Sequence, residues 1–484
     1  MDILGKGSII VEQRIYIVID LKSFYASVEC VERGLDTMTA RLVVADPERT
    51  EKTICLSISP AMKRLGIHNR CRVFEIPKSV DYIMAQPRMQ LYIDYAAGIY
   101  GIYLKYISKE DIHVYSIDEC FMDVTNYLPL YHMTARELGQ TIMADIFREY
   151  GIRATCGVGT NLYLAKIALD ITAKHSPDFI GELDEETFQR TLWDHKPLTD
   201  FWRIGRGIAA KLEKYGIHTA GDIARTDEDF LYKLFGVDAE LLIDHAWGRE
   251  TATIAAIRSY KARTNCLTSG QVLGCDYSFE DAKLIVKEMM DLLCLEMVEK
   301  NLVSDSVTLQ VGYSRQLAVE SSRGTASLDA ETNADIILVP AVSALFERIA
   351  NPNLAIHRLN ISVNHVIEEE YRQYSMFTDA WELERNRKLQ SAMLDIKKKF
   401  GKNAILKGMN LQDASTMQER NQQIGGHKSG IYNSGRDKNG GDKNSGDKNS
   451  GDRNGGGKNS GDKNSGGREY KGRENRTGGN RDGR

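Results

Sequence analysis

The sequence lacks three features that would place the chain in a specialised class of protein. Its eight cysteines are far apart and include no C-x-x-C pair, so they indicate neither a zinc site nor a disulfide framework. No apolar run is long enough to span a membrane and no signal-peptide pattern is present, which predicts a cytoplasmic protein with no membrane partner. The formal net charge is −4, so the chain as a whole has no basic signature for nucleic acid.

The composition changes abruptly after about residue 425. Five consecutive five-residue units, GDKNS GDKNS GDRNG GGKNS GDKNS, run from Gly441 to Ser465. Repeats of this kind cannot bury a core, so we expect residues 425–484 to be a disordered tail. The tail has 14 basic and 8 acidic residues, a formal charge of +6, which leaves −10 on the preceding residues. Nucleic acid would therefore have to be held by local basic patches.

The 484 residues are enough for three or four domains. In residues 14–173 the expected order of elements is β-α, then β-β-α-β-α, which predicts a mixed sheet with helices on one face. Strands with alternating apolar residues at 306–313 and 359–363 follow an amphipathic helix that Ser278 is expected to cap. These elements predict a separate small α+β domain.

Residues 114–124, VYSIDECFMDV, place two adjacent acids in a run that is otherwise typical of a buried strand. Neighbouring side chains on a straight strand point to opposite faces, so Asp118 and Glu119 can meet at one spot only if the chain turns between them. Two close carboxylates then require a cation. Asp20, which ends the apolar run RIYIVID, could complete a site of three carboxylates.

Oxygen-only ligands favour Mg²⁺ or Mn²⁺ over zinc. Two such ions can activate a hydroxyl, stabilise a leaving oxygen and hold a polyphosphate, which is the two-metal route to nucleotidyl transfer. On spacing alone, the alternative is that Asp118 and Glu119 cap a surface hairpin.

Residues 201–217, FWRIGRGIAAKLEKYGI, carry a Gly-x-Gly turn between helical segments and resemble a helix-hairpin-helix motif. The turn of such a motif offers backbone N–H groups to a phosphate. The alternative is a tight connection between two helices that binds nothing.

Three segments resemble, in order, the catalytic motifs of the Y-family lesion-bypass DNA polymerases: IDLKSFYASVE (19–29), YSIDECFMDVT (115–125) and GVGTNLYLAKIA (157–168). The match is similar to the UmuC/ImpB-like branch of Gram-positive bacteria or their mobile elements. It implies an α+β, multidomain fold of the kind called a right hand, in which palm, fingers and thumb domains surround the active site. The expected parts are a palm (1–31 and 80–173), fingers (32–79), a helical thumb with the helix-hairpin-helix (174–246), a linker (247–262), an α+β little finger (263–368), a clamp-binding and helical segment (369–424) and the disordered tail (425–484).

The resemblance also implies a set of site residues. Two Mg²⁺ ions, for which Mn²⁺ can substitute, would be held by the catalytic Asp20, Asp118 and Glu119 and by the main-chain carbonyl of Leu21. The nucleotide would contact Phe24, Tyr25, Ser59, Lys63 and Lys166. DNA would contact Ile204, Gly205, Arg206, Gly207 and Ile208. A sliding clamp would contact Gln373, Met376 and Phe377.

Several of these roles have simpler alternatives. Tyr25 would exclude ribonucleotides by lying under the sugar, although an aromatic residue at a strand-helix junction can simply pack there. Lys166 would reach the triphosphate, unless it is a solvated surface lysine. Many family members carry a tyrosine and an arginine, three residues apart, that grip the phosphates, whereas this chain has Pro60 and Lys63. Lys63 lacks the bidentate fork of arginine, which leaves Ser59 and Lys63 as substitutes.

The segment QYSMF, residues 373–377, resembles the clamp-binding peptide of bacterial polymerases. A polar anchor followed by apolar side chains can fill a groove on a partner. The alternative is that Met376 and Phe377 pack back on the helix that Asp379 is expected to begin.

The resemblance implies an error-prone, DNA-templated DNA polymerase of the SOS response to DNA damage. The sequence shows no separate exonuclease-like segment, so we expect no proofreading. The expected partners are primer-template DNA, dNTPs and the clamp, with the polymerase acting as a monomer. Two alternatives are a non-catalytic DNA- and clamp-binding accessory protein and a metal-dependent nucleotide cyclase. The cyclase would leave the helix-hairpin-helix and the clamp peptide unexplained.

Overall fold

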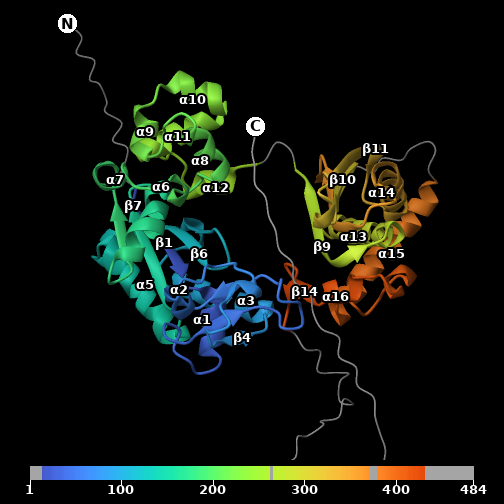
Figure 1. The fold of residues 1–484 in the computed structure, drawn as a ribbon, viewed down its shortest axis with the longest axis horizontal. Helices are drawn as coiled ribbons and strands as arrows, with labels where there is room; N and C mark the ends of the chain where they lie inside the picture. Colours follow the sequence, from blue (N-terminus) through green and yellow to red (C-terminus); the bar gives the residue numbers. More distant parts are fainter. Residues whose placement is uncertain (1–13, 262–264, 371–378, 431–484) are drawn as a thin grey trace, which may run out of the picture. The chain divides into compact units, whose positions relative to one another are not determined.

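The computed structural model describes residues 14–261, 265–370 and 379–430 (Figure 1). Within these ranges no helix is both long and apolar enough to cross a membrane. The expected clamp peptide lies outside the described residues, as does the tail from residue 431 onward.

The first sheet, in the region expected to be the palm, has the strand order β5-β6-β1-β7-β8. Its pairs are antiparallel except β7 with β8, which is parallel, so the sheet is mixed as predicted. Strand β8 lies beyond residue 174, where the thumb was expected to begin. The strands are β1 (Tyr16–Leu21), β5 (Ile112–Val114), β6 (Glu119–Asp123), β7 (Ala154–Gly159) and β8 (Ile180–Leu183).

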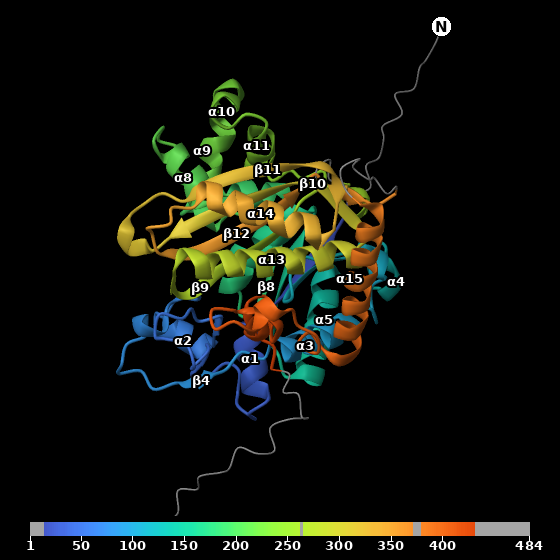
Figure 2. The ribbon, with the colours of Figure 1, turned by 90° about the vertical axis from the view of Figure 1, so that its right-hand side faces the viewer.

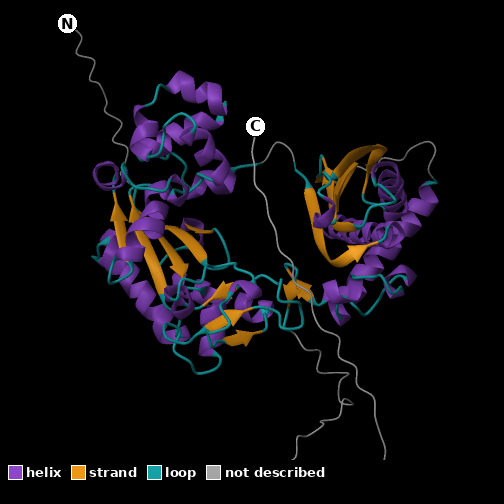
Figure 3. Ribbon diagram, in the orientation of Figure 1, coloured by secondary structure: helices purple, strands orange, loops and turns teal. Residues whose placement is uncertain are grey.

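Helices cover both faces of this sheet, so the prediction of helices on one face is wrong (Figure 3). Ile17 and Ile19 of β1 lie in a core with α1, α3 and α5, whereas Tyr16 and Val18 lie in another core with α6. The cause is that β1 is apolar on both faces, and each face must be covered. The helices are α1 (Phe24–Val31), α3 (Met89–Tyr103), α4 (Tyr127–Tyr131), α5 (Ala135–Tyr150) and α6 (Leu162–Ile167).

A small sheet with the order β3-β2-β4 forms the region expected to be the fingers. Strand β4 pairs in parallel with β2. The sheet therefore extends past residue 79, the expected boundary. Its elements are β2 (Leu42–Val44), β3 (Ser57–Ile58), α2 (Pro60–Arg64) and β4 (Ile83–Ala85).

Residues 185–259 are helical, as expected for a thumb. The last of these helices, α12, falls in the segment expected to be a linker, and its residue Ile254 is buried in the same core as Tyr16. The helices are α7 (Glu185–Leu192), α8 (Arg206–Glu213), α9 (Ala220–Arg225), α10 (Glu228–Phe235), α11 (Asp238–Trp247) and α12 (Ile254–Ser259).

A separate α+β unit follows, as the sequence predicts. Its sheet has the order β11-β10-β12-β9, and α13 and α14 cover one face (Figures 1 and 2). Ser278 caps α13 by accepting a hydrogen bond from the Asp281 N–H at 3.2 Å. The elements are β9 (Leu267–Tyr277), α13 (Phe279–Glu299), β10 (Leu302–Tyr313), β11 (Ser322–Thr332), α14 (Asp335–Ile349), β12 (Ile356–Asn364) and β13 (Ile367–Glu368).

The described chain ends in helix α15 (Ala380–Phe400), helix α16 (Met417–Asn421) and a hairpin of β14 (Gln423–Ile424) and β15 (His427–Lys428). Asp379 caps α15, as expected. The expected start of the tail at residue 425 is wrong, because residues 425–428 form the turn and second strand of the hairpin. The two glycines at this turn, which have positive φ, mark a tight turn rather than the onset of the repeats.

Candidate active site

Two of the three expected carboxylates are brought together by strand pairing. Asp20 on β1 lies directly opposite Glu119 on β6 in the antiparallel ladder, so both side chains leave the same face of the sheet. The hairpin before Glu119 turns as predicted, with the N–H groups of Tyr115 and Ser116 donating to its carbonyl oxygen at 3.0 and 3.1 Å. Asp118 therefore lies in the turn, not on a straight strand with Glu119.

Helix α6 lies close over this face because two glycines of the strand beneath it have no side chain. A Cβ atom on Gly157 would lie 2.1 Å from the Ala165 carbonyl oxygen, and one on Gly159 would lie 2.2 Å from the Ala165 nitrogen. This close approach brings Lys166 of α6 to the carboxylates. Its Nζ lies 2.8 Å from Oε2 of Glu119.

Lys166 is buried between two carboxylates. Its Nζ lies 3.1 Å from Asp170 Oδ2 as well as near Glu119. Burial lowers the pKa of Lys166, but Asp170 and Glu119 outweigh that effect and raise it, so the ammonium stays charged. The alternative of a solvated surface lysine is therefore wrong. The ammonium contacts two acidic groups, which leaves one of its three N–H donors without a described acceptor, and the expected triphosphate contact stays a prediction.

The carboxylates form a crowded, partly desolvated anionic site. Burial, reinforced by the charges of Asp118 and Glu119, raises the pKa of Asp20 to about 7. Oε1 of Glu119 is buried and has no hydrogen-bond partner among the described groups. A buried carboxylate oxygen without a donor is costly unless a cation approaches it. The all-oxygen donor set and this unpartnered atom fit a hard divalent cation.

The three side chains are neighbours but are not arranged as a finished coordination shell. In the described ranges, no group of three or more His, Cys, Asp or Glu side chains is placed to hold a metal ion. Two contacts account for this. Lys166 takes one oxygen of Glu119, and Oδ1 of Asp118 accepts a hydrogen bond from Ser116 Oγ at 2.6 Å. The main chain of Leu21 bonds to the same turn, its N–H donating to the Asp118 carbonyl at 2.9 Å.

Two lysines, Lys22 and Lys63, feel the charge of Asp20, and a third, Lys174, lies close enough to act on both of these lysines. Lys63 of α2 is exposed, yet partial burial of its ammonium group and the charge of Lys174 lower its pKa, while Asp20 and Asp118 act in the opposite direction. Burial also lowers the pKa of Lys22, and the charges of Lys63 and Lys174 lower it further. Like charges this close favour an anion between them. The grouping is a cationic patch beside an acidic one.

Ser59 and Phe24, two of the expected nucleotide contacts, have buried side chains. Ser59 is fully buried, and its Oγ donates to the Ala40 carbonyl at 2.7 Å and accepts from the Leu42 N–H at 3.1 Å. Its hydroxyl links the start of α2 to Ala40 and to the first residue of β2, so its one O–H donor is already used. The side chain of Phe24 is buried in the core beneath the sheet.

Tyr25 lies at the edge of the site and is partly buried. Burial and the charge of Asp118 raise its pKa, so the phenol stays neutral and lies near the carboxylate. Its ring stacks on that of Tyr92, with centroids 4.5 Å apart and planes at 16°. The ring of Tyr25 can therefore pack on Tyr92 and also lie under the sugar of an incoming nucleotide, so the two interpretations do not exclude each other.

The glycine turn of the expected DNA-binding motif begins helix α8. Gly205 is the N-cap, Arg206 and Gly207 are exposed, and Ile204 is buried beneath them. The first N–H groups of a helix have no partner within the helix, so an exposed start of this kind can receive a phosphate. Only the helix after the turn is present in full, because a single 3-10 turn, Leu198–Asp200, precedes it. Contact with DNA by residues 204–208 stays a prediction.

Sequence reasoning missed several residues that the structure brings to the site. Lys22 follows the first carboxylate motif, and Lys174 lies on the helical run after Lys166, so both could have been noticed as basic residues beside the motifs. Asp170 stands four residues after Lys166, a spacing that predicts an ion pair on a helix. Tyr92 carried no local signal, because its partner is 67 residues away.

Comparison with known proteins gives consistent matches along the chain. The model of the impB/mucB/samB family matches residues 19–170, and that of the impB/mucB/samB family C-terminal domain matches residues 268–376. Together they match more than half of the chain. UvrX of Bacillus subtilis (strain 168), whose name refers to UV-damage repair, is 29% identical over 413 residues, covering 85% of this chain and 97% of UvrX.

Two further matches extend this likeness. A protein named DNA polymerase IV 2, from Halalkalibacterium halodurans, is 29% identical over 416 residues, covering 86% of this chain and 99% of its own. The solved structure of a Y-family DNA polymerase chimera matches with a TM-score of 0.56 and 19% identity, covering 73% of this chain and 99% of that one. The structural match shows that the fold is that of the right-handed Y-family polymerases, as predicted.

Proposed function

The chain belongs to the impB/mucB/samB family of Y-family DNA polymerases, and we propose that it extends a primer past damaged template bases by two-metal nucleotidyl transfer without proofreading. The observation that best supports this chemistry is an acidic patch next to a basic one. Asp20 lies opposite Glu119 on one face of the sheet. The lysine patch consists of Lys22, Lys63 and Lys174, and the first two of these interact electrostatically with Asp20. An acidic patch for cations beside a basic patch for phosphates suits a metal-bound nucleoside triphosphate.

Asp20, Asp118 and Glu119, with the Leu21 carbonyl, would hold two divalent ions, Mg²⁺ or, in its place, Mn²⁺. When bound, these ions would activate the primer 3′-OH and neutralise the triphosphate. Lys166 would also position the carboxylates: its ammonium pairs with Glu119 at 2.8 Å and partly offsets the rise that burial causes in the pKa of Glu119. The lysine patch would hold the triphosphate in place of the tyrosine and arginine that many family members use.

We propose the remaining contacts on the same basis. Residues 204–208 would touch a DNA phosphate through the start of α8, and the α+β unit of 267–368 would be the little finger that grips the duplex. The protein would act as a monomer in the cytoplasm, within the SOS response.

Replacing the lysine patch should weaken nucleotide binding more than chemistry. For Lys63→Ala combined with Lys174→Ala we expect KM for dNTPs to rise about tenfold to a hundredfold, because two charge-assisted phosphate contacts are lost. Steady-state kinetics at saturating DNA measures this. Lys78→Ala, which removes an exposed lysine of the same region, is the matched control. An unchanged KM in the double variant would show that the patch does not hold the triphosphate.

The clamp peptide gives a second prediction. For Met376→Ala combined with Phe377→Ala, clamp-stimulated synthesis should disappear while unassisted synthesis and Tm stay the same, because the apolar side chains would fill a pocket on the clamp. Ser375→Ala, within the same segment, should retain the stimulation. A lower Tm with the stimulation intact would instead show that the two side chains pack on the chain itself.

Primer extension on matched undamaged and abasic templates tests the proposed function. With Mg²⁺ and all four dNTPs, we expect full extension on the first template and extension past the lesion on the second. Extension that always stops before the abasic site would contradict lesion bypass. DNA binding without any extension on either template would favour the non-catalytic accessory.

A further inference from the structure

The ring of Tyr25 rests on a second ring that the structure holds rigidly. Tyr92 of α3 is fully buried, and its ring stacks on that of Tyr25 with centroids 4.5 Å apart. Stacked rings at this distance leave no room for either to move toward the other. The position of Tyr92 therefore limits how far Tyr25 can retreat from the site.

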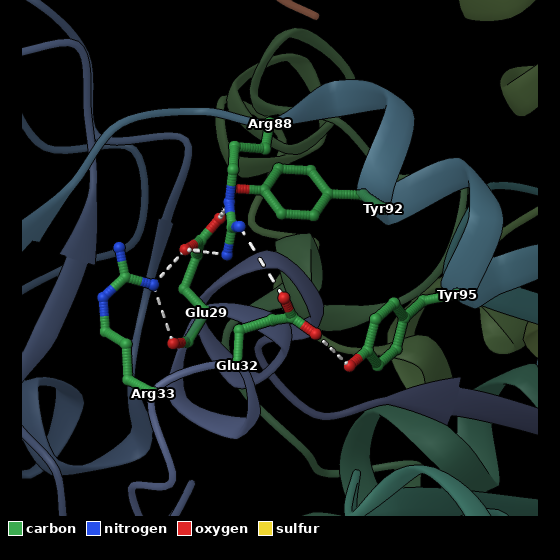
Figure 4. A network of polar contacts seen from close by, with 6 residues as sticks. All are labelled: Glu29, Glu32, Arg33, Arg88, Tyr92 and Tyr95. Atoms are coloured by element: carbon green, nitrogen blue, oxygen red, sulfur yellow. Dashed lines mark hydrogen bonds and ion pairs between the residues drawn. The ribbon is translucent and has the colours of Figure 1, made fainter. Parts of the chain in front are cut away.

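Tyr92 is fixed by a partly buried ion pair, in which the carboxylate is fully buried and the arginines are partly exposed (Figure 4). Its hydroxyl donates to Oε1 of Glu29 at 2.7 Å. Arg88 donates to both oxygens of the same carboxylate, through Nε at 3.0 Å and Nη2 at 2.9 Å, and Arg33 pairs with it from the other side. Burial would raise the pKa of Glu29, but these donors outweigh it and lower the pKa, so the fully buried carboxylate stays charged.

The stack and the ion pair join the same two helices. Tyr25 and Glu29 are one turn apart on α1, and Arg88 and Tyr92 are one turn apart at the start of α3. Each helix therefore presents one ring and one charged group to the other. A bidentate ion pair between arginine and a buried carboxylate has one favoured geometry, so it limits the spacing of the helices at the level of the stack.

We propose that Tyr92, anchored by Glu29 and Arg88, is a positioning residue for sugar selection: it holds the Tyr25 ring against the space that a ribose 2′-OH would need. This inference rests on the proposed function of Tyr25 in excluding ribonucleotides. Without the second ring, Tyr25 can tilt back and admit the hydroxyl. Discrimination between dNTP and rNTP then falls while the chemistry of deoxynucleotide addition stays intact.

The test is the ratio of kcat/KM for a dNTP to that for the matching rNTP, measured on one primer-template with the full chain. For Tyr92→Leu, which removes the ring, we expect the ratio to fall about tenfold or more, since a steric barrier is relaxed. For Tyr92→Phe, which keeps the ring but loses its anchor, we expect a smaller fall, about twofold to fivefold.

Tyr95 supplies matched controls on the same helix. Its hydroxyl donates to Glu32 at 2.7 Å and its ring packs on Tyr150, not on Tyr25. Tyr95→Phe and Tyr95→Leu should leave the sugar ratio unchanged. A merely structural loss would lower both kcat/KM values together and would not move their ratio.

A double-mutant cycle with Tyr25→Ala separates this inference from the function on which it rests. If Tyr92 acts through Tyr25, Tyr92→Leu should have no further effect on the ratio once Tyr25 is alanine. An unchanged ratio in both Tyr92 variants, while Tyr25→Ala relaxes it, would overturn the positioning role alone. An independent further fall in the double variant would overturn it too. An unchanged ratio in Tyr25→Ala itself would instead remove the proposed role of Tyr25.

Discussion

Asp118→Asn is expected to lower the single-turnover rate of nucleotide incorporation about a thousandfold or more, because it deletes a metal-binding charge with little change of shape. The amide oxygen can still accept the hydrogen bond from Ser116 Oγ, so the turn that presents residue 118 should persist. DNA affinity and Tm should therefore stay close to those of the parent chain. Rapid-quench measurement of one dNTP addition at saturating DNA gives the rate directly.

Asp123→Asn is the matched control for this variant. Asp123 is a buried acid at the other end of β6, where it pairs with Arg14 at 2.6 Å. Its replacement should lower Tm while leaving the rate of the chemical step near that of the parent chain. Near-normal incorporation by Asp118→Asn would contradict the assignment of that carboxylate to the metals.

The second large effect concerns the sugar of the incoming nucleotide. For Tyr25→Ala we expect ribonucleotide incorporation to rise about tenfold to a thousandfold, because discrimination by excluded space is lost with the ring. Incorporation of dNTPs should change much less. The measurement is single-nucleotide addition from dNTP and rNTP at the same template base. Tyr25→Phe keeps the ring and should keep the discrimination, whereas equal selectivity in the alanine variant would show that Tyr25 only packs against Tyr92.

The positions of the candidate carboxylates could be predicted because their signal is local. Asp20 ends an apolar strand, and the pair at 118 and 119 interrupts another, so each charge is conspicuous where it stands. Strand pairing then places Asp20 opposite Glu119. The starts of two helices could also be predicted from the sequence, since Ser278 and Asp379 cap the helices they were expected to cap.

The rest of the site depends on contacts between distant segments. Ser59 stands at the start of α2, as expected, but its hydroxyl forms hydrogen bonds with Ala40 and with Leu42 at the start of β2. Lys166 was expected to face phosphate, yet the glycines of β7 let α6 lie so close that its ammonium meets Glu119. The contacts of Ser59 and Lys166 could not be predicted from their neighbours in the sequence, because they depend on how closely two distant elements pack.

Two short strands join sheets across the expected boundaries at residues 79 and 174 for a related reason. Strand β4 joins the fingers sheet and β8 joins the first sheet through parallel pairing with strands far away in sequence. Short strands of three or four residues carry little periodicity, so they are easily assigned to a neighbouring part.

The central claim is that this chain adds nucleotides as a template dictates, using divalent ions held by the carboxylates on β1 and β6. The most direct measurement is addition of each single dNTP to a primer, opposite each of the four template bases, with Mg²⁺ and with a chelator. We expect the complementary nucleotide to be added fastest at most template positions, and all addition to stop when the chelator is present. Addition that ignores the template base, or that continues at full rate in the chelator, would contradict the account.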